Sequence, residues 1–195
     1  MPDTLAPGVV EPLLSGRFGR PYRYVESCPS TQRLLDEDNE EGAVAVAEEQ
    51  TEGRGRLGRT WHAPPRSSVL VSVLLRPAVE PARLPELSLV AGRAVAEAIR
   101  GTGVEPSVKF PNDVLVDGRK VAGILAEASD GRVVLGIGVN VNQTDDDLPS
   151  ETGTRPTSLR LETGAPVDRA RLLAAILERL ERAYDEWVTE SATSG

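Results

Sequence analysis

The chain contains almost no cysteine, histidine or lysine. Cys28 is the only cysteine among 195 residues, so no internal disulfide can form, and the composition fits a reducing compartment such as the cytoplasm. His62 is the only histidine, which excludes multi-histidine metal sites and leaves a Cys/His zinc cluster without ligands. His62 also lies in a proline-rich context, which argues against a Ser-His-Asp triad. Lysine is confined to Lys109 and Lys120, and the other twenty basic residues are arginines.

Other absences narrow the class of protein further. No apolar run approaches the length of a membrane span, and residues 1–12 lack the basic and apolar regions of a signal peptide. Aromatic residues make up only 4% of the chain, so the core must be mostly Val, Leu, Ala and Ile. The net charge of −8 argues against general nucleic-acid binding. The length fits one domain over residues 1–195.

Hydrophobic periodicity predicts both strands and helices. Strands are expected at 22–27, 43–48, 68–75, 107–110, 114–116, 120–126 and 132–141, helices at 84–100 and 168–189, and a short helix after an N-cap at Ser30-Thr31. Asp117-Gly118 and Asp130-Gly131 are hairpin signals. We expect residues 1–21, 53–67 and 143–157 to be irregular and residues 191–195 to be frayed. This pattern favours an α+β fold with a mixed, largely antiparallel sheet packed against helices.

The segment Gly53-Arg-Gly-Arg-Leu-Gly58-Arg59 is the first candidate site. It matches the G-x-G-x-x-G pattern of dinucleotide-binding folds, but Trp61, Pro64 and Pro65 follow and do not form the helix that this fingerprint needs. Free backbone amides and three arginines suit a polyanion, and the glycines would let the loop close over a bound phosphate. The alternative is a solvated basic loop.

Two further segments each place a charged or amide side chain beside a strand. In Lys109-Phe-Pro-Asn-Asp113, the proline favours an extended residue before it and would hold Asn112 and Asp113 at a strand-to-turn junction. The alternative is an ordinary turn. Lys120 begins an apolar strand, where its compact ammonium could bridge a carboxylate and a phosphate, and Gly123 would permit close approach of a ligand. The alternative for Lys120 is a solvated residue at a strand end.

The segment Gly136-Ile-Gly138-Val-Asn140-Val-Asn142 has glycines inside an apolar strand, which again indicates a ligand lying against backbone. Asn140 has apolar neighbours on both sides. A buried amide needs partners, so its side chain must bond either to protein or to a ligand.

Together these segments resemble the catalytic domain of biotin–protein ligases, also called biotin–acetyl-CoA-carboxylase ligases. Five motifs occur in the order of that family: Ser30-Thr31-Gln32, Gln50 with Gly53-Arg-Gly-Arg-x-Gly-Arg-x-Trp61, Lys109-x-Pro-Asn-Asp113, Gly118-Arg-Lys120-x-Ala-Gly-Ile-Leu and Gly136-Ile-Gly-x-Asn140-Val-Asn142. The resemblance implies a ligase that activates biotin with MgATP as biotinyl-5′-AMP. A lysine of a biotin carboxyl carrier protein then attacks this anhydride and releases AMP.

The resemblance also implies roles for single residues. Biotin would be bound by Ser30, Thr31, Gln32, Gln50, Arg54, Gly55, Arg56, Lys120 and Gly123. ATP or the adenylate would be bound by Arg56, Arg59, Trp61, Asn112, Lys120 and Asn140, and Mg²⁺ would come with ATP. Lys120 and Arg54 would be catalytic, and Asp113 would orient or deprotonate the acceptor amine, since an ammonium is no nucleophile.

This chain departs from the family pattern in three places. Phe110 stands where the family usually has Trp, which keeps an aromatic ring but loses an N–H donor. The residues before Ser30 are too few for the winged-helix DNA-binding domain of some relatives, so we expect no DNA partner. A small C-terminal β-domain, common after the long helix, is not expected before Gly195. An edge strand of the predicted sheet could pair two copies of the chain into a homodimer.

Three alternative functions stay open at the level of sequence. A lipoate or octanoyl ligase or transferase shares the general fold, but such enzymes lack the Gly-Arg-Gly-Arg loop of this chain. A non-enzymatic biotin sensor would keep the pocket without the transfer. A nucleic-acid-binding module using the arginine loop conflicts with the net charge.

Overall fold

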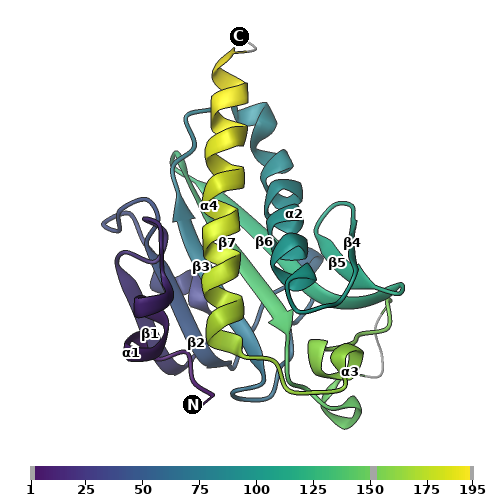
Figure 1. Ribbon diagram of the computed structural model, residues 1–195. Coiled ribbons are helices and arrows are strands. Elements are labelled where there is room, and N and C mark those ends of the chain that lie inside the picture. The colour runs from purple at the N-terminus through teal and green to yellow at the C-terminus, as the bar shows by residue number, and fades with distance from the viewer. Residues whose placement is uncertain (1–2, 150–152, 194–195) are drawn as a thin grey trace.

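The fold is known from a computed structural model that describes residues 3–149 and 153–193. Seven strands in these ranges form one sheet in the order β1-β2-β3-β7-β6-β5-β4 (Figure 1). Their bounds are β1 (Tyr22–Cys28), β2 (Val44–Gln50), β3 (Ser68–Leu75), β4 (Pro106–Lys109), β5 (Asp113–Val116), β6 (Arg119–Ser129) and β7 (Arg132–Asn140). β1 and β2 pair in parallel, and the other neighbours pair antiparallel. The predicted mixed, largely antiparallel α+β fold is therefore confirmed.

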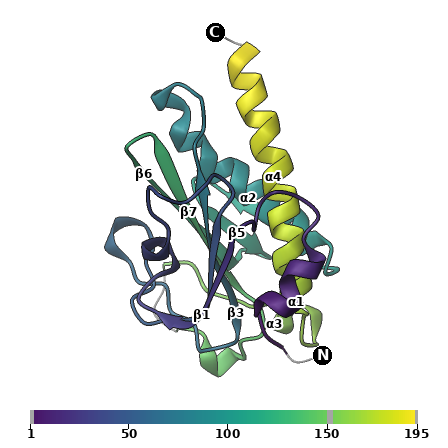
Figure 2. The ribbon, with the colours of Figure 1, turned by 90° about the vertical axis from the view of Figure 1, so that its left-hand side faces the viewer.

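Two long helices, α2 (Leu87–Arg100) and α4 (Arg169–Thr193), cover one face of the sheet (Figures 1 and 2). Both carry apolar residues at helical spacing, as Leu173, Leu177, Leu180 and Tyr184 show in α4, where all four are buried. This face holds the main core, because the side chains of the central strands pack there against the two helices. No helix in the described ranges is long and apolar enough to cross a membrane.

The two predicted hairpin turns are confirmed. Asp117 and Gly118 have φ of 48° and 75°, and Asp130 and Gly131 have φ of 51° and 75°. Two successive residues with positive φ form the tight turn whose twist matches antiparallel strands, and Asp-Gly accepts this geometry at little cost. The first turn joins β5 to β6 and the second joins β6 to β7.

The prediction of an irregular segment over residues 1–21 is wrong in part. The helix α1 (Pro7–Val10) and the 3₁₀ turn η1 (Glu11–Leu13) lie within it, beside α4 (Figure 2). Leu5, Val10 and Phe18 are buried in the main core. Apolar residues at this irregular spacing can be buried by a short helix and a turn, which produce no long periodic signal.

Smaller differences concern the ends of elements and short turns. Ser30 precedes a 3₁₀ turn, η2 (Thr31–Leu34), without a capping bond from its side chain, so the predicted capping interaction is wrong. Short elements that were not predicted are the 3₁₀ turns η3 (Arg56–Gly58) and η5 (Asp145–Asp147) and the helix α3 (Leu159–Thr163). The predicted helix over 84–100 is divided into the 3₁₀ turn η4 (Pro81–Glu86) and α2. α4 continues to Thr193, so residues 191–193 are helical rather than frayed. Residues 1–2, 150–152 and 194–195 lie outside the described ranges.

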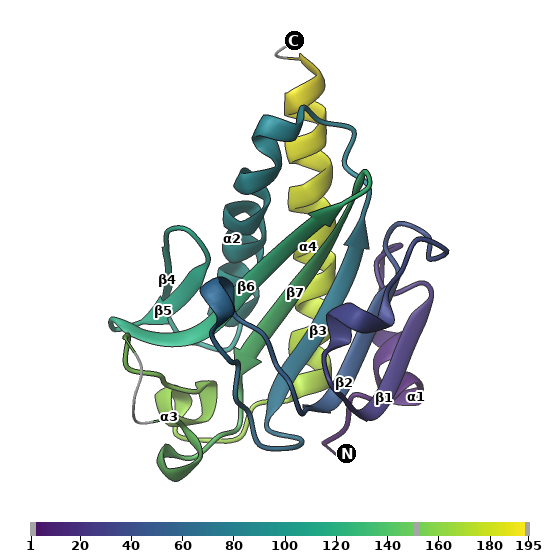
Figure 3. The same ribbon diagram turned by 180° about the vertical axis from the view of Figure 1, so that it is seen from behind.

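The second face of the sheet is covered by no long helix of the described residues. The turn η2 and the segment 51–67 lie over β3, β7 and β6 on this side (Figure 3). A small second core of Leu35, Ala43, Ala45, Leu74 and Val134 fixes η2 to the sheet. This open face, partly roofed by one loop, holds the candidate site.

Candidate functional site

Two adjoining cavities lie on the open face of the sheet. The first cavity, of about 50 Å³, is lined by Ser30, Thr31, Gln32, Gln50, Arg54, Gly55, Trp61, Val71, Asn112, Lys120, Gly123, Ile124, Leu125, Gly136, Ile137 and Gly138. The second cavity, of about 560 Å³, is lined by Gly55, Arg59, Thr60, Trp61, His62, Asp113, Lys120, Asn140, Pro149, Gly153, Thr154 and Pro156. Gly55, Trp61 and Lys120 line both cavities and mark their junction.

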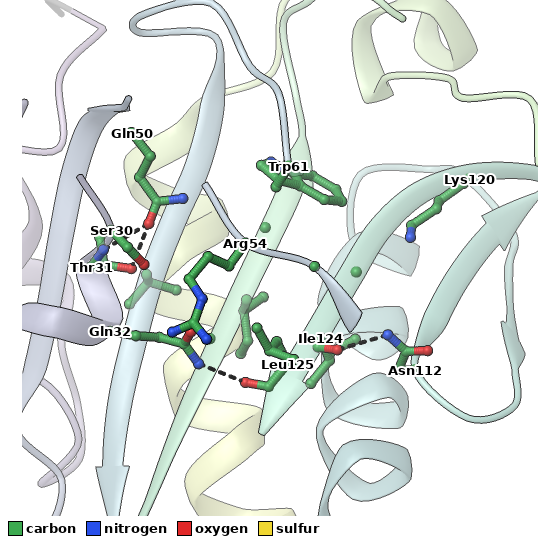
Figure 4. Close-up of a pocket in the computed structure, with 16 residues that line it drawn as sticks. Ser30, Thr31, Gln32, Gln50, Arg54, Trp61, Asn112, Lys120, Ile124 and Leu125 are labelled. Carbon is green, nitrogen blue, oxygen red and sulfur yellow. Dashed lines mark hydrogen bonds between the residues drawn. The ribbon is translucent and has the colours of Figure 1, made fainter. Parts of the chain in front are cut away.

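One end of the first cavity is a fixed cluster of polar groups (Figure 4). The Thr31 backbone N–H and hydroxyl both donate to Gln50 Oε1, at 2.7 and 3.0 Å. The Thr31 hydroxyl also lies 2.8 Å from the hydroxyl of Ser72. Gln32 Nε2 donates to the carbonyl of Leu125 at 3.0 Å. These bonds hold the three side chains in defined positions, which prepares the cluster to recognise a small polar group.

A loop formed by residues 53–61, called here the lid, roofs the first cavity. The N–H of Trp61 donates to the carbonyl of Gly53 at 2.9 Å, and the N–H of Gly55 donates to that of Arg59 at 2.7 Å. Arg54 then reaches β6, where its guanidinium binds both carboxylate oxygens of Glu127 at 2.8 and 3.1 Å. Figure 4 shows Arg54 and Trp61 above the cavity, and their side chains leave little free volume beneath them.

A pair of glycines forms the floor beneath Trp61. Gly123 on β6 and Gly138 on β7 are direct partners in the sheet. A Cβ atom on Gly138 would lie 2.6 Å from Cε2 of Trp61, and one on Gly123 would lie 3.0 Å from Cζ3. The indole can rest against the sheet only because both positions lack a side chain. Its Nε1 is buried and has no hydrogen-bond partner within the described part of the chain.

Lys120 lies at the junction of the two cavities. Its Nζ is 2.7 Å from Oδ1 of Asp113 and 5.6 Å from the centre of the Trp61 ring. Its backbone is held from the other side, because its N–H donates to the Arg155 carbonyl and its own carbonyl accepts from the N–H of Thr157, both at 2.8 Å. The β5–β6 hairpin therefore presents one ammonium, backed by one carboxylate, to both cavities.

Two asparagines are bonded to the protein rather than left free. Asn112 Nδ2 donates to the carbonyl of Ile124 at 2.9 Å, and its Oδ1 accepts from Arg56 Nη1 at 3.4 Å. Asn140 is buried, donates to the carbonyl of Thr157 at 3.0 Å and accepts from Gln143 Nε2 at 3.1 Å. These bonds orient both amides at the walls of the cavities.

The sequence-predicted residues gather at this site with one exception. Arg59, Trp61, Asp113, Lys120 and Asn140 line the second cavity, and the predicted biotin-binding residues other than Arg56 line the first. Arg56 lines neither cavity and is exposed on the turn η3. What each residue binds stays a prediction.

Several residues of the site were not assigned from the sequence. Ser72 is one, although a lone polar residue in the apolar strand Ser68–Leu75 is a signal that could have found it. Pro149, Gly153, Thr154 and Pro156 also line the second cavity, and nothing in the loop-like sequence around them indicates this. His62 also lines the second cavity.

The charges around the cavities favour an anionic ligand. Arg54, Arg59 and Lys120 face the cavities, against Asp113 as the one carboxylate among the lining residues. No group of three His, Cys, Asp or Glu residues that could hold a metal exists among the residues that the structure describes. The nearby thiol of Cys28 is buried at the end of β1, and burial raises its pKa, which makes it a poor nucleophile.

The geometry suits the joining of two substrates. A small molecule with a polar head and a carboxylate would place its head at Thr31 and Gln50 and its carboxylate near Lys120, at the other end of the first cavity (Figure 4). A nucleotide in the second cavity would bring a phosphate to the same ammonium. Lys120 would then neutralise both reacting groups.

Comparisons with known proteins agree with this geometry. Residues 24–143 match the biotin/lipoate A/B protein ligase family. The chain is 37% identical over 186 residues to the bifunctional ligase/repressor BirA of Bacillus subtilis, covering 90% of this chain and 57% of that protein. It is 42% identical over 153 residues to the biotin–[acetyl-CoA-carboxylase] ligase of Mycobacterium tuberculosis, covering 75% of this chain and 56% of that protein.

A solved structure extends the likeness to three dimensions. The biotin protein ligase from Aquifex aeolicus in complex with biotin and ATP superimposes with a TM-score of 0.78 at 38% identity, over 86% of this chain and 72% of that one. The chain thus spans somewhat more than half the length of the two curated relatives and nearly three quarters of this structure.

Proposed function

Because the chain belongs to the biotin/lipoate A/B protein ligase family, we propose that it activates biotin with ATP and transfers it to a lysine of a biotin carboxyl carrier domain. The observation that carries this proposal is the position of Lys120 at the junction of two cavities, beside Asp113. One cavity would bind biotin and the other ATP, so that the biotin carboxylate meets the α-phosphate at this lysine.

In the first step, the biotin carboxylate attacks the α-phosphorus of ATP, which gives biotinyl-5′-AMP and pyrophosphate. Two anions repel each other as they approach, and fixed cations offset this repulsion and stabilise the charge of the transition state. Lys120 and Arg54 would supply that charge, and Arg56 and Arg59 would reach the phosphates when the lid closes. A closed lid also excludes water, which would otherwise hydrolyse the mixed anhydride.

In the second step, the acceptor amine attacks the biotinyl carbonyl and AMP leaves. The amine must be neutral to attack, and Asp113 is the nearest carboxylate to Lys120, at 2.7 Å. We assign to Asp113 the orientation or deprotonation of the incoming amine.

Magnesium fits the site as part of the ATP complex. Mg²⁺ usually keeps several waters and is held by substrate phosphates with one or two protein oxygens. Asn112 and Asn140 would supply such contacts at the walls, and Asp113 is a further oxygen donor in the second cavity. The ion would neutralise phosphate charge.

The polar end of the first cavity favours biotin over lipoate. The ureido ring of biotin has two N–H donors and a carbonyl acceptor, whereas the dithiolane ring of lipoate has neither. Thr31, Gln50 and Gln32 offer both hydroxyl and amide groups there, already held in place. A dithiolane could form no hydrogen bond with this polar end, whereas the ureido ring could both donate to it and accept from it.

The test is exchange of labelled pyrophosphate into ATP with biotin or with lipoate. We expect exchange with biotin only, and loss of at least 100-fold in Lys120→Ala, as is typical for removal of a group that stabilises transition-state charge. The melting temperature of this variant should stay close to that of the wild type. Exchange with lipoate alone would refute the proposal, and equal losses of stability and exchange would give Lys120 a structural role.

A further inference from the structure

Two large apolar side chains are exposed at the entrance to the cavities and have no part in the proposed reaction. Leu57 is 89% exposed and Phe110 is 78% exposed, whereas the other exposed large apolar residues, Leu13 and Leu161, reach only 39% and 40%. Leu57 occupies the tip of the lid, and Phe110 lies two residues before Asn112, which lines the first cavity. Exposed apolar side chains that gather beside a site indicate an interaction surface.

The two apolar residues belong to turns that contact each other. Arg56, next to Leu57, donates from Nη1 to Asn112 Oδ1 at 3.4 Å. The turn after Phe110 is itself fixed on the sheet, because the N–H of Ile124 donates to the Asn112 carbonyl at 2.9 Å. Asn112 and Lys120 lie at the same end of the first cavity (Figure 4). Leu57 and Phe110 therefore flank the end of the site where the anhydride would form.

The charge beside these residues is positive, although the chain as a whole carries −8. Arg56, Arg59 and Lys109 are exposed there, and no ion pair links any of them to a carboxylate among the described residues. Lys109 Nζ donates to the hydroxyl of Thr154 at 3.2 Å. Lys109 does not line either cavity, so it is not among the residues that would contact biotin or ATP.

We propose that Leu57, Phe110 and Lys109, called here the rim patch, dock the protein domain that presents the acceptor lysine. This inference rests on the proposed function. An amine on a folded domain can reach the anhydride at Lys120 only if the surface of that domain lies against the entrance, between the lid tip and the Phe110 turn. Leu57 and Phe110 require the partner face to be apolar near the acceptor lysine. The positive charge of Lys109 requires an acidic group at the margin of that face.

The test separates docking from activation. In Leu57→Ala/Phe110→Ala, the KM for an isolated biotin carboxyl carrier domain should rise about tenfold, since apolar anchors at the centre of an interface dominate its affinity. Pyrophosphate exchange with biotin should stay within twofold of the wild type. Capture of the adenylate by hydroxylamine, a small amine that needs no docking, should also be unchanged. The matched control is Leu13→Ala, which truncates an exposed leucine in η1, on the helical side of the sheet.

A second variant tests the electrostatic part without removing apolar surface. Lys109→Glu should raise the KM for the carrier domain most strongly at low salt, with the difference from the wild type shrinking as salt screens the charges. An unchanged KM in both variants, or an equal rise in Leu13→Ala, overturns the docking proposal while leaving exchange intact. A wild-type dimer that the double variant dissociates also overturns it, because the patch would then bind a second copy. Failure of the wild type to form the adenylate would instead refute the proposed function.

Discussion

Replacement of Gly138 by alanine tests whether the position of Trp61 controls ligand binding. The new Cβ would lie 2.6, 2.9 and 3.0 Å from three atoms of the indole, where ordinary contact begins at 3.4 Å. The strand itself accepts alanine, because Gly138 does not have a positive φ. The indole must therefore move away from the floor by about 1 Å, since atoms this close repel steeply. Trp61 is carried by the lid, so the lid must move with it.

The size of the effect follows from the cost of overpacking. An added methyl group in a well-packed site costs about 1–3 kcal/mol. The lid is anchored mainly by Trp61 and by the exposed Arg54–Glu127 pair. We therefore expect the added methyl group to weaken the binding of biotin rather than to lower the free energy of unfolding. At about 1.4 kcal/mol per factor of ten, biotin should bind roughly 5- to 150-fold more weakly. The melting temperature should change little.

Titration calorimetry with biotin, together with thermal unfolding, measures both quantities. Gly8→Ala is the matched control, since a Cβ at Gly8 would have no atom within 4 Å. The Gly138→Ala effect should shrink in a Trp61→Leu background, where the clashing ring is absent. Unchanged biotin affinity in Gly138→Ala, or the same loss of affinity with and without the tryptophan, would refute the role given to the glycine floor.

Three further predictions concern the lid, a buried ion pair and the single cysteine. Glu127→Gln should speed release of biotinyl-5′-AMP about two- to fivefold in a rapid-dilution assay, because it loosens the Arg54 contact that holds the lid. The effect is modest because the ion pair is half-exposed, and an unchanged release rate would mean that the contact does not hold the lid. Glu48→Gln should lower the free energy of unfolding by about 1–3 kcal/mol in urea, because it removes the buried carboxylate that lies 2.7 Å from the fully buried Arg169 and leaves this arginine only Asp3 as an anionic partner. The double variant Glu48→Gln/Arg169→Met should recover part of the loss. Cys28 should react slowly with iodoacetamide at pH 8 in the folded protein and rapidly in urea, because burial raises the pKa of its thiol and fewer thiolates form; equal rates would contradict this.

Local patterns in the sequence were sufficient for most of the sheet. The strand Ser68–Leu75 was predicted with its exact bounds, and both Asp-Gly turns form as expected, because each depends on residues close together in the chain. The predicted site residues also meet at the two cavities, apart from Arg56. Motif spacing locates such residues well when the strands that carry them are correctly predicted.

What the sequence could not predict depends on contacts between distant segments. Glu48 and Arg169 are 121 positions apart, and only the fold reveals that they form a buried ion pair. The bond between Arg54 and Glu127 spans 73 positions and fixes the lid. The burial of Leu5 and Phe18 likewise requires the long helix α4 to be in place. In each case the partner is supplied by the tertiary structure, on which local propensity carries no information.

We propose different roles for the two lysines of this chain. Lys120 lies where two reacting anions would meet, and Lys109 lies outside the cavities, on the rim patch. Arginine supplies fixed charge at the lid and in the buried ion pair, where its planar fork binds two oxygens at once.

The central claim is that this site joins biotin to AMP. The most direct measurement incubates the protein with biotin and ATP labelled in the α-phosphate, with Mg²⁺ and pyrophosphatase, and quantifies protein-bound acyl-adenylate after rapid gel filtration. We predict close to one biotinyl-5′-AMP per chain, which disappears with release of AMP when a biotin carboxyl carrier domain is added. An adenylate that forms with lipoate but not with biotin, or no adenylate with either acid, would contradict the account.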